Sequence, residues 1–188
     1  MAKFVKKQNG TKYYEVDGYR ASGIIPYFKR GDNYYILVNS EIRSKRKLYH
    51  FLGGKVELKD RVIQETALRE ANEESGYLIN SLVPSLYQMI LKENKYIKII
   101  KSKYISFLVD IESSVVRHWL NLPELFNKMF KNSNYELKHN ESLRLDWKSL
   151  NYLDSNIDKM SYLGKIIIYK LKKKFQIDSD SDCQFLDS

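Results

Sequence analysis

The chain has 188 residues, of which 43% are hydrophobic and 29% charged, and its formal net charge is +9. This length and composition are typical of a globular domain with a buried core, and the 15 tyrosines and 8 phenylalanines favour a strand-rich core over a disordered chain. No apolar run approaches the roughly 20 residues that a membrane-spanning helix needs, so no membrane partner is expected.

The cysteine content and the first residues set an expectation for the compartment. The chain has one cysteine, Cys183, which excludes an internal disulfide framework. The basic stretch MAKFVKKQNG is not followed by an apolar segment, so a secretory signal is not expected. We therefore expect a cytoplasmic protein in a reducing, intracellular setting. The positive charge favours anionic partners, although solubility explains it equally well.

The first third of the chain is rich in strand-forming residues. Residues 19–28 and 33–40 are two such runs, separated by KRGD, which is typical of a hairpin turn. Residues 47–52 form a third run that leads straight into Gly53 and Gly54. We expect three strands here, the third ending in the glycine pair.

The rest of the chain mixes helices and strands. Helical spacing of apolar residues runs from about Val62 to Ser75, and Gly76 is a natural C-cap. Further on we expect strands at 86–93, 103–111 and 142–150 and helices at 123–132 and 157–175. We find no internal repeat and no linker, so residues 1–177 are expected to form one domain, followed by an acidic, disordered tail at 178–188.

The helix after the glycine pair carries several carboxylates on one side. At about 100° per residue, Glu70, Glu73 and Glu74 fall within an arc of about 100°. They share that side of the helix with its apolar residues, so they point towards the Gly-Gly loop and not into solvent. Like charges placed together repel, and a bound divalent cation would neutralise them. Ligands that are all oxygen atoms suit Mg²⁺ or Mn²⁺.

These residues resemble a known motif, the Nudix box, across residues 54–77. That box reads Gly-x5-Glu-x7-Arg-Glu-apolar-x-Glu-Glu-x-Gly-apolar. Its second half is matched in register by Arg69, Glu70, Ala71, Glu73, Glu74, Gly76 and Tyr77.

The first half of the box departs from the pattern. Counting forward from Gly54 puts Asp60 at the glutamate position, whereas counting back from Arg69 puts Arg61 there. The loop is therefore one residue longer than the common form. The loop carboxylate is either Asp60 or Glu57, and the sequence leaves both open.

The resemblance implies a fold and an activity. The fold is an α/β/α sandwich with a mixed β-sheet, the box helix on one side and the C-terminal helix on the other. The activity is metal-dependent hydrolysis of a diphosphate linked to another group. The metal ligands implied are the carbonyl of Gly53 and the carboxylates of Glu57, Glu70, Glu73 and Glu74.

The resemblance also implies roles for other residues. Arg69 would orient the glutamates by ion pairs, as its i,i+4 relation to Glu73 permits. Lys55 would face the substrate phosphates. The general base varies within the family, and the two candidates here are Glu70 and Glu141.

The substrate class remains open at this level. The default is a nucleoside-diphosphate-linked small molecule. The alternative driven by net charge is capped RNA, for which Arg43 and Arg46 in the basic stretch IRSKRK would contact the substrate. A third class is a binding module that keeps the fold without catalysis. Nothing in the sequence sets the oligomeric state.

Overall fold

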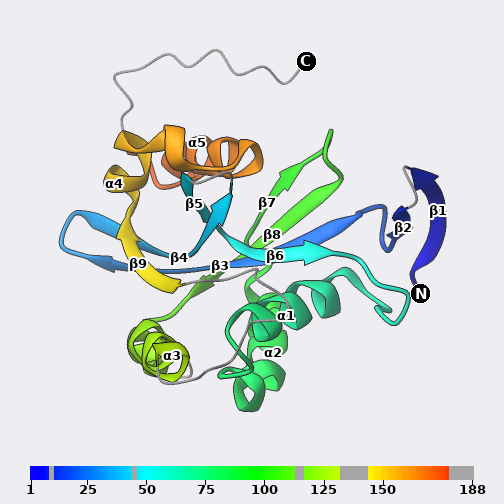
Figure 1. The fold of residues 1–188 in the computed structure, drawn as a ribbon, viewed down its shortest axis with the longest axis horizontal. Helices are drawn as coiled ribbons and strands as arrows, with labels where there is room; N and C mark the ends of the chain where they lie inside the picture. Colours follow the sequence, from blue (N-terminus) through cyan, green and yellow to red (C-terminus); the bar gives the residue numbers. More distant parts are fainter. Residues whose placement is uncertain (9–10, 44–45, 113–116, 132–143, 178–188) are drawn as a thin grey trace.

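A mixed β-sheet forms the centre of the protein (Figure 1). The computed structural model describes residues 1–8, 11–43, 46–112, 117–131 and 144–177. Within these residues the sheet has seven strands in the order β5-β4-β3-β8-β7, with β6 also pairing with β3 and β9 with β4. The strands are β3 (Ala21–Arg30), β4 (Asn33–Arg43), β5 (Arg46–His50), β6 (Leu52–Lys55), β7 (Tyr96–Ile99), β8 (Tyr104–Asp110) and β9 (Arg144–Ser149).

Strand β3 is the centre of this sheet. It pairs parallel with β8 along most of its length and antiparallel with β6 and β4. Neighbouring residues on β3 belong to opposite faces: Ile24 packs in one core cluster and Ile25 in the other, and both are fully buried. A strand covered on both faces reads as a continuous apolar run, which is why GIIPYF carries no polar alternation.

Helices cover both faces of the sheet (Figure 1). Residues of α1, α2 and α3 pack in the cluster on one face, and residues of α4 and α5 pack in the cluster on the other. No helix among the described residues is long and apolar enough to cross a membrane. The helices are α1 (Ile63–Glu74), α2 (Val83–Glu93), α3 (Leu122–Lys131), α4 (Leu150–Ser155) and α5 (Tyr162–Lys174).

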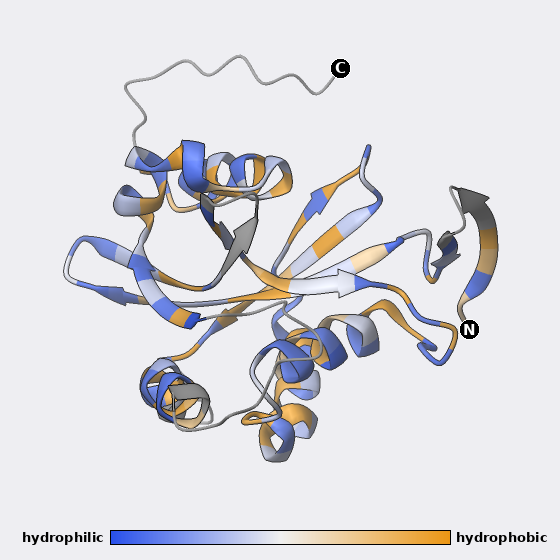
Figure 2. Cartoon of the chain, in the orientation of Figure 1, coloured by the Kyte–Doolittle hydropathy of each residue, from blue (hydrophilic) through white to orange (hydrophobic). Residues whose placement is uncertain are grey.

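The predicted three-layer α/β/α sandwich with a mixed sheet is therefore confirmed. Hydrophobic residues lie along the central strands and on the helix sides that face them, with polar residues outside (Figure 2). The tail predicted at 178–188 lies outside the described residues, and a single domain over 1–177 stays a prediction.

The box helix α1 forms as its sequence predicts. Its apolar residues Ile63, Ala67 and Ala71 recur every four positions and are buried against the sheet. Gly76 ends the helix with a positive φ of 63°, a conformation that glycine adopts at little cost, and its N–H donates to the Glu73 carbonyl.

The strand predicted at 86–93 is wrong, because these residues belong to helix α2. Pro84 lies in the first turn of this helix, where its missing N–H is not needed. Leu86 and Ile90 are four residues apart and both buried, so they form one apolar stripe. Helical packing decides the structure over the strand preference of the local residues.

Other elements differ from the predictions in extent. The strand predicted at 47–52 is split, because the chain leaves β4 after His50 and pairs with β3 from Leu52 onwards. The helix predicted at 157–175 is also split: Met160 is extended, and α5 begins after Ser161, whose hydroxyl accepts from the Gly164 N–H. Helix α4 was not predicted.

The N-terminal hairpin was not predicted either. Strands β1 (Lys3–Gln8) and β2 (Thr11–Glu15) pair antiparallel as a sheet of their own. The hairpin leads into Asp17, whose carboxylate accepts a hydrogen bond from the Ile63 N–H at 3.0 Å. The N-cap residue of α1, Val62, has no side-chain oxygen, so a residue distant in sequence caps this helix.

Asp17 is expected to stabilise the start of α1. Asp17→Ala should lower the free energy of unfolding by about 1–2 kcal/mol, because the helix loses its cap and alanine disfavours the positive φ at this position. Asp17→Asn keeps an oxygen acceptor and tolerates that φ, so it should cost clearly less. Urea denaturation of the three proteins tests this, and equal stability of the Ala and Asn variants would contradict it.

Candidate functional site

The site is built around the glycine pair at the end of the sheet. Gly53 on β6 lies opposite Gly23 on β3, and a Cβ added to Gly53 would lie 2.6 Å from the Gly23 Cα. A Cβ added to Gly54 would collide with the carboxylate of Glu70. The absence of side chains at Gly53 and Gly54 thus lets α1 bring a carboxylate directly against the backbone of β6.

A second carboxylate of α1 contacts the same strand. Glu74 Oε2 accepts a hydrogen bond from the Gly53 N–H at 2.9 Å. Glu70 and Glu74 are one helical turn apart, so the helix presents both to the Gly53–Gly54 backbone. This is the orientation that the helical wheel predicts.

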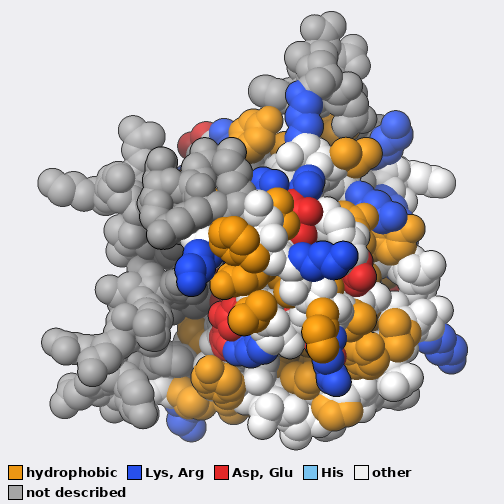
Figure 3. All heavy atoms as spheres, turned by 90° about the vertical axis from the view of Figure 1, so that its right-hand side faces the viewer, with side chains coloured by type: hydrophobic (Ala, Val, Ile, Leu, Met, Phe, Trp, Pro, Cys, Tyr) orange, Lys and Arg blue, Asp and Glu red, His pale blue; other side chains and the backbone are white. Residues whose placement is uncertain are grey.

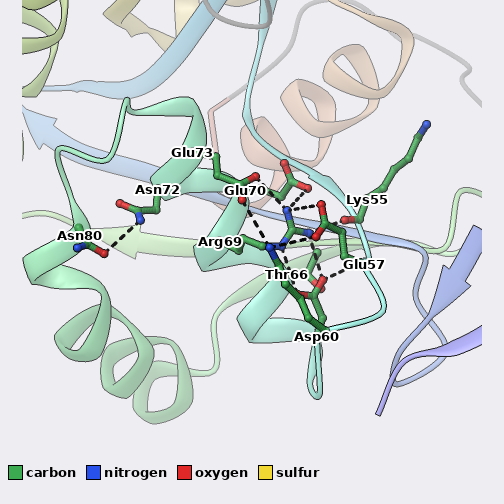
Figure 4. A network of polar contacts seen from close by, with 10 residues as sticks. Lys55, Glu57, Asp60, Thr66, Arg69, Glu70, Asn72, Glu73 and Asn80 are labelled. Carbon is green, nitrogen blue, oxygen red and sulfur yellow. Dashed lines mark hydrogen bonds and ion pairs between the residues drawn. The ribbon is translucent and has the colours of Figure 1, made fainter. Parts of the chain in front are cut away.

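Arg69 is the centre of a polar network beside these carboxylates (Figure 4). Its side chain is only 11% exposed. Two of its nitrogens donate to Asp60, Nε at 3.2 Å and Nη2 at 3.1 Å, in a bidentate pair. Asp60 is 3% exposed and also accepts from the Thr66 hydroxyl at 2.8 Å and the Glu57 N–H at 2.8 Å.

The other side of the Arg69 guanidinium faces the helix carboxylates. Nη1 donates to Glu70 at 2.8 Å and to Glu73 at 3.1 Å, and Nη2 donates to the carbonyl of Lys55 at 2.7 Å. One cation therefore connects the loop, the glycine strand and two successive turns of α1. The positions of Glu70 and Glu73 depend on it.

The buried pair changes the acidity of both partners. Burial alone would raise the pKa of Asp60, but hydrogen bonds from Arg69, the Glu57 N–H and Thr66 outweigh burial and hold that pKa below its usual value. Burial would lower the pKa of Arg69, whereas the Asp60 hydrogen bond and the negative charges of Glu70 and Asp60 raise it above its usual range. Both groups are therefore charged at neutral pH.

Glu57 and Lys59 lie at the exposed edge of the network. The Glu57 side chain is 50% exposed, with its carboxylate 3.5 Å from Arg69 Nη1 and 3.1 Å from Lys59 Nζ. Lys59 Nζ also lies 4.0 Å from Glu73. The two loop carboxylates thus differ: Asp60 is buried under the guanidinium, and Glu57 is accessible beside it.

The donor set fits a hard divalent cation by its chemistry. Glu57, Glu70, Glu73 and Glu74 offer carboxylate oxygens beside the Gly53–Gly54 backbone, the ligand type that Mg²⁺ and Mn²⁺ prefer. In the described part of the chain, no three His, Cys, Asp or Glu side chains are already clustered closely enough to hold a metal ion. Instead, Arg69 and Lys59 neutralise carboxylates of this set, so a cation would have to replace some of those contacts.

The remaining predicted residues are Glu141, Arg43, Arg46 and Lys55. Glu141 lies outside the described residues. Arg43 and Arg46 pair with each other through their backbones, where β4 meets β5, and their side chains lie outside the described part. Lys55 ends β6, and its side chain is exposed.

Sequence reasoning missed two members of the network, Thr66 and Lys59. Thr66 is fully buried on α1 and donates to Asp60. The sequence could have indicated this role, because Thr66 lies two helical turns before Glu73, on the side of the helix that packs against the protein. Lys59 carries no such signal, since an exposed loop lysine is ordinary in sequence.

Comparisons with known proteins add two kinds of finding. No family model matches the chain, and no curated protein matches it in sequence. Among solved structures, it is similar to a Nudix hydrolase from M. smegmatis, RenU, with 13% identity over 93% of this chain and 96% of the other, at a TM-score of 0.47. It is also similar to a C. elegans Ap4A hydrolase, with 14% identity over 84% and 98% of the two chains, at a TM-score of 0.45.

The chain resembles Nudix hydrolases. The resemblance is carried by the box residues themselves, in which Arg69 and the glutamates of α1 gather against the glycine pair.

Asp60 is expected to stabilise the fold in a pH-dependent way. Asp60→Asn should lower the free energy of unfolding at neutral pH by about 3 kcal/mol, because it leaves a buried guanidinium without its charged partner. A carboxylate with a lowered pKa stabilises the fold fully above its unfolded pKa of about 3.9, and this contribution is lost as the pH falls through its folded pKa. The gap between the two proteins should therefore narrow below about pH 4.

Denaturant unfolding across acid and neutral pH measures this gap. The control is Asp158→Asn, which changes an exposed aspartate and should leave the stability close to wild type at every pH. A gap between wild type and Asp60→Asn that stays constant into acid would contradict the assignment.

Proposed function

We propose that this chain is a Nudix-type hydrolase that uses Mg²⁺ or Mn²⁺ to cleave the diphosphate linkage of a nucleoside-diphosphate-linked small molecule. The observation that supports the proposal best is the Arg69 network, in which one buried cation connects Glu70 and Glu73 to the end of the glycine strand. A helix whose carboxylates only faced solvent would need no buried cation between them. Mutual repulsion among the carboxylates would otherwise drive them apart.

The proposed metal ligands are the carbonyl of Gly53 and the carboxylates of Glu57, Glu70, Glu73 and Glu74. A divalent cation bound there would polarise the diphosphate and lower the pKa of an attacking water. Lys55, exposed at the end of the strand, would contact the phosphate oxygens. An ammonium at this position contributes a mobile point charge, which suits phosphates of varied geometry.

The two loop carboxylates take different roles in this proposal. Asp60 is a positioning residue, because it contacts Arg69 and is too buried to reach a substrate. Glu57 is half exposed beside the guanidinium and is the ligand from the loop. Such a division would also explain the longer loop, since it accommodates two carboxylates three positions apart, the accessible ligand Glu57 and the buried Asp60.

Glu70 and Glu141 remain the proposed candidates for the general base. The position of Glu70 suits a general base, since its side chain is only 13% exposed and lies against Gly54. A base must lie within hydrogen-bond reach of the attacking water, and a side chain fixed between a guanidinium and a glycine backbone is held in one place.

Removal of the proposed ligands should abolish hydrolysis without unfolding the protein. Glu73→Gln and Glu74→Gln should each lower activity by more than the roughly 10–100-fold typical of groups that only support a metal ligand, and Glu57→Gln should also lower it. Mg²⁺ should raise the melting temperature of the wild type and raise it less in these variants. The assay should offer Mg²⁺ or Mn²⁺ with nucleotide sugars, dinucleoside polyphosphates, NADH, coenzyme A and diphosphoinositol phosphates.

The matched control is Glu65→Gln on the same helix. Glu65 pairs with Arg61, away from the proposed ligands, so its variant should keep full activity. Wild-type activity in Glu73→Gln or Glu74→Gln would contradict the ligand assignment. A wild type inactive on every substrate, yet stabilised by Mg²⁺, would favour the alternative of a binding module without catalysis.

Salt dependence should separate a small substrate from capped RNA. A protein making about six phosphate contacts loses on the order of a thousandfold in affinity between 50 and 200 mM salt, because each neutralised phosphate releases counterions. We expect hydrolysis of the preferred substrate to vary far less. The triple substitution Arg43→Ser, Lys45→Ser and Arg46→Ser should barely change nucleotide-sugar hydrolysis. A steep salt slope for cap release that this triple variant abolishes would favour the RNA alternative.

A further inference from the structure

The N-terminal hairpin (residues 3–15) is fastened to the loop of the box. The Met1 ammonium donates to the Arg61 carbonyl at 3.0 Å, and the Ala2 N–H donates to the Asp60 carbonyl at 3.0 Å. Asp17, just after the hairpin, caps the box helix. The hairpin therefore lies beside the loop that carries Glu57 and Asp60, at the right-hand side of Figure 1.

The two faces of β2 have different surroundings. Tyr14 packs against the hydrophobic core, and Val16 just after the strand is buried in it. Because side chains alternate along a strand, Tyr13 and Glu15 face the other way. Among the described residues, the ring of Tyr13 belongs to neither core cluster and is only partly buried.

The described contact of the Tyr13 ring is with Lys55. The Lys55 ammonium lies 5.8 Å from the ring centroid, close to the outer limit of about 6 Å for a cation–π contact. Lys55 is also the residue whose carbonyl accepts from Arg69. Lys55 thus connects Tyr13 to the Arg69 network that holds the carboxylates.

The charges around this face are mainly positive. Glu15 is neutralised twice, by Arg20 at 2.7 Å and by Lys103 at 2.6 Å. The contacts described for Tyr13 and Glu15 thus involve three cations, Arg20, Lys103 and Lys55, against one carboxylate. The space-filling view of this side shows hydrophobic and basic side chains interspersed, with few acidic ones (Figure 3).

We propose that Tyr13 is the stacking platform for the aromatic base of the substrate, an inference that rests on the proposed function. A nucleoside diphosphate carries a planar base a short distance from its phosphates. Phosphate oxygens would draw the Lys55 ammonium off the ring, because charge-assisted hydrogen bonds to phosphate are stronger than a cation–π contact at this distance. The ring face is then exposed to the base, and stacking on tyrosine is tolerant of base identity.

The first test compares a substrate that has bases with one that has none. Tyr13→Ala should raise KM for a dinucleoside polyphosphate by roughly 5- to 150-fold, with little change in kcat, because stacking holds the base and not the reacting phosphate. Its KM for a diphosphoinositol phosphate should stay unchanged. Tyr13→Trp should restore the KM for the dinucleoside substrate.

Phe4→Ala is the matched control on the same hairpin. The Phe4 ring is 56% exposed and packs edge-on to Tyr14 at 6.1 Å, so it is an accessible aromatic residue on the neighbouring strand with no described contact to Lys55. Its removal should leave both KM values at the wild-type level. A similar KM rise in Phe4→Ala and Tyr13→Ala would point to general loosening of the hairpin and would overturn the proposal.

The second test measures binding without turnover. ADP with Mg²⁺ should quench the fluorescence of the tryptophan introduced in Tyr13→Trp, and inorganic pyrophosphate should not. The wild-type protein gives the background fluorescence of the native tryptophans. If the wild type hydrolyses no substrate, the proposed function fails, and this quenching alone decides the present inference. Absence of ADP quenching, or an equal KM rise for substrates with and without bases, would overturn it.

Discussion

The buried ion pair between Arg69 and Asp60 is the interaction on which the rest of the candidate site depends. A guanidinium that is 11% exposed needs acceptors for its donors, because an unpaired buried charge is strongly destabilising. Asp60 supplies the bidentate partner, and Glu70 and Glu73 supply the others. The same pair that satisfies the arginine also brings like-charged carboxylates together on one helix.

The sheet imposes a second constraint on this region. Gly23 and Gly53 face each other across β3 and β6, and the hydroxyl of Tyr104 occupies the space where their side chains would lie. That hydroxyl accepts from Ser106 at 2.8 Å. Burial raises the pKa of Tyr104 above its usual range, and the negative charges of Glu74 and Glu70 raise it further, so the phenol stays neutral. Gly53 has no side chain, and the ring of Tyr104 beside it is neutral. Helix α1 can therefore lie close to strand β6.

The hairpin and the loop of the box support one another. The carbonyls of Asp60 and Arg61 accept from the first two residues of the chain, while Asp17 caps the helix that follows the loop. These contacts hold the end of the loop that leads into α1, although the loop carries an additional residue. In the proposed function, this leaves Glu57 accessible while Asp60 remains fixed beneath the guanidinium.

The sequence by itself determined the register of the box helix, the placement of most strands and the side of the helix that carries the carboxylates. These features depend on local periodicity and on glycine, which act over a few residues. Only the tertiary structure decided that 86–93 is helical, because the stripe of Leu86 and Ile90 matters only when a core is present to receive it. It also decided that Asp60 and not Glu57 is buried against Arg69. The sequence left both carboxylates open, and the choice between them depends on contacts with Thr66 and the Glu57 backbone that form only when the loop folds onto the helix.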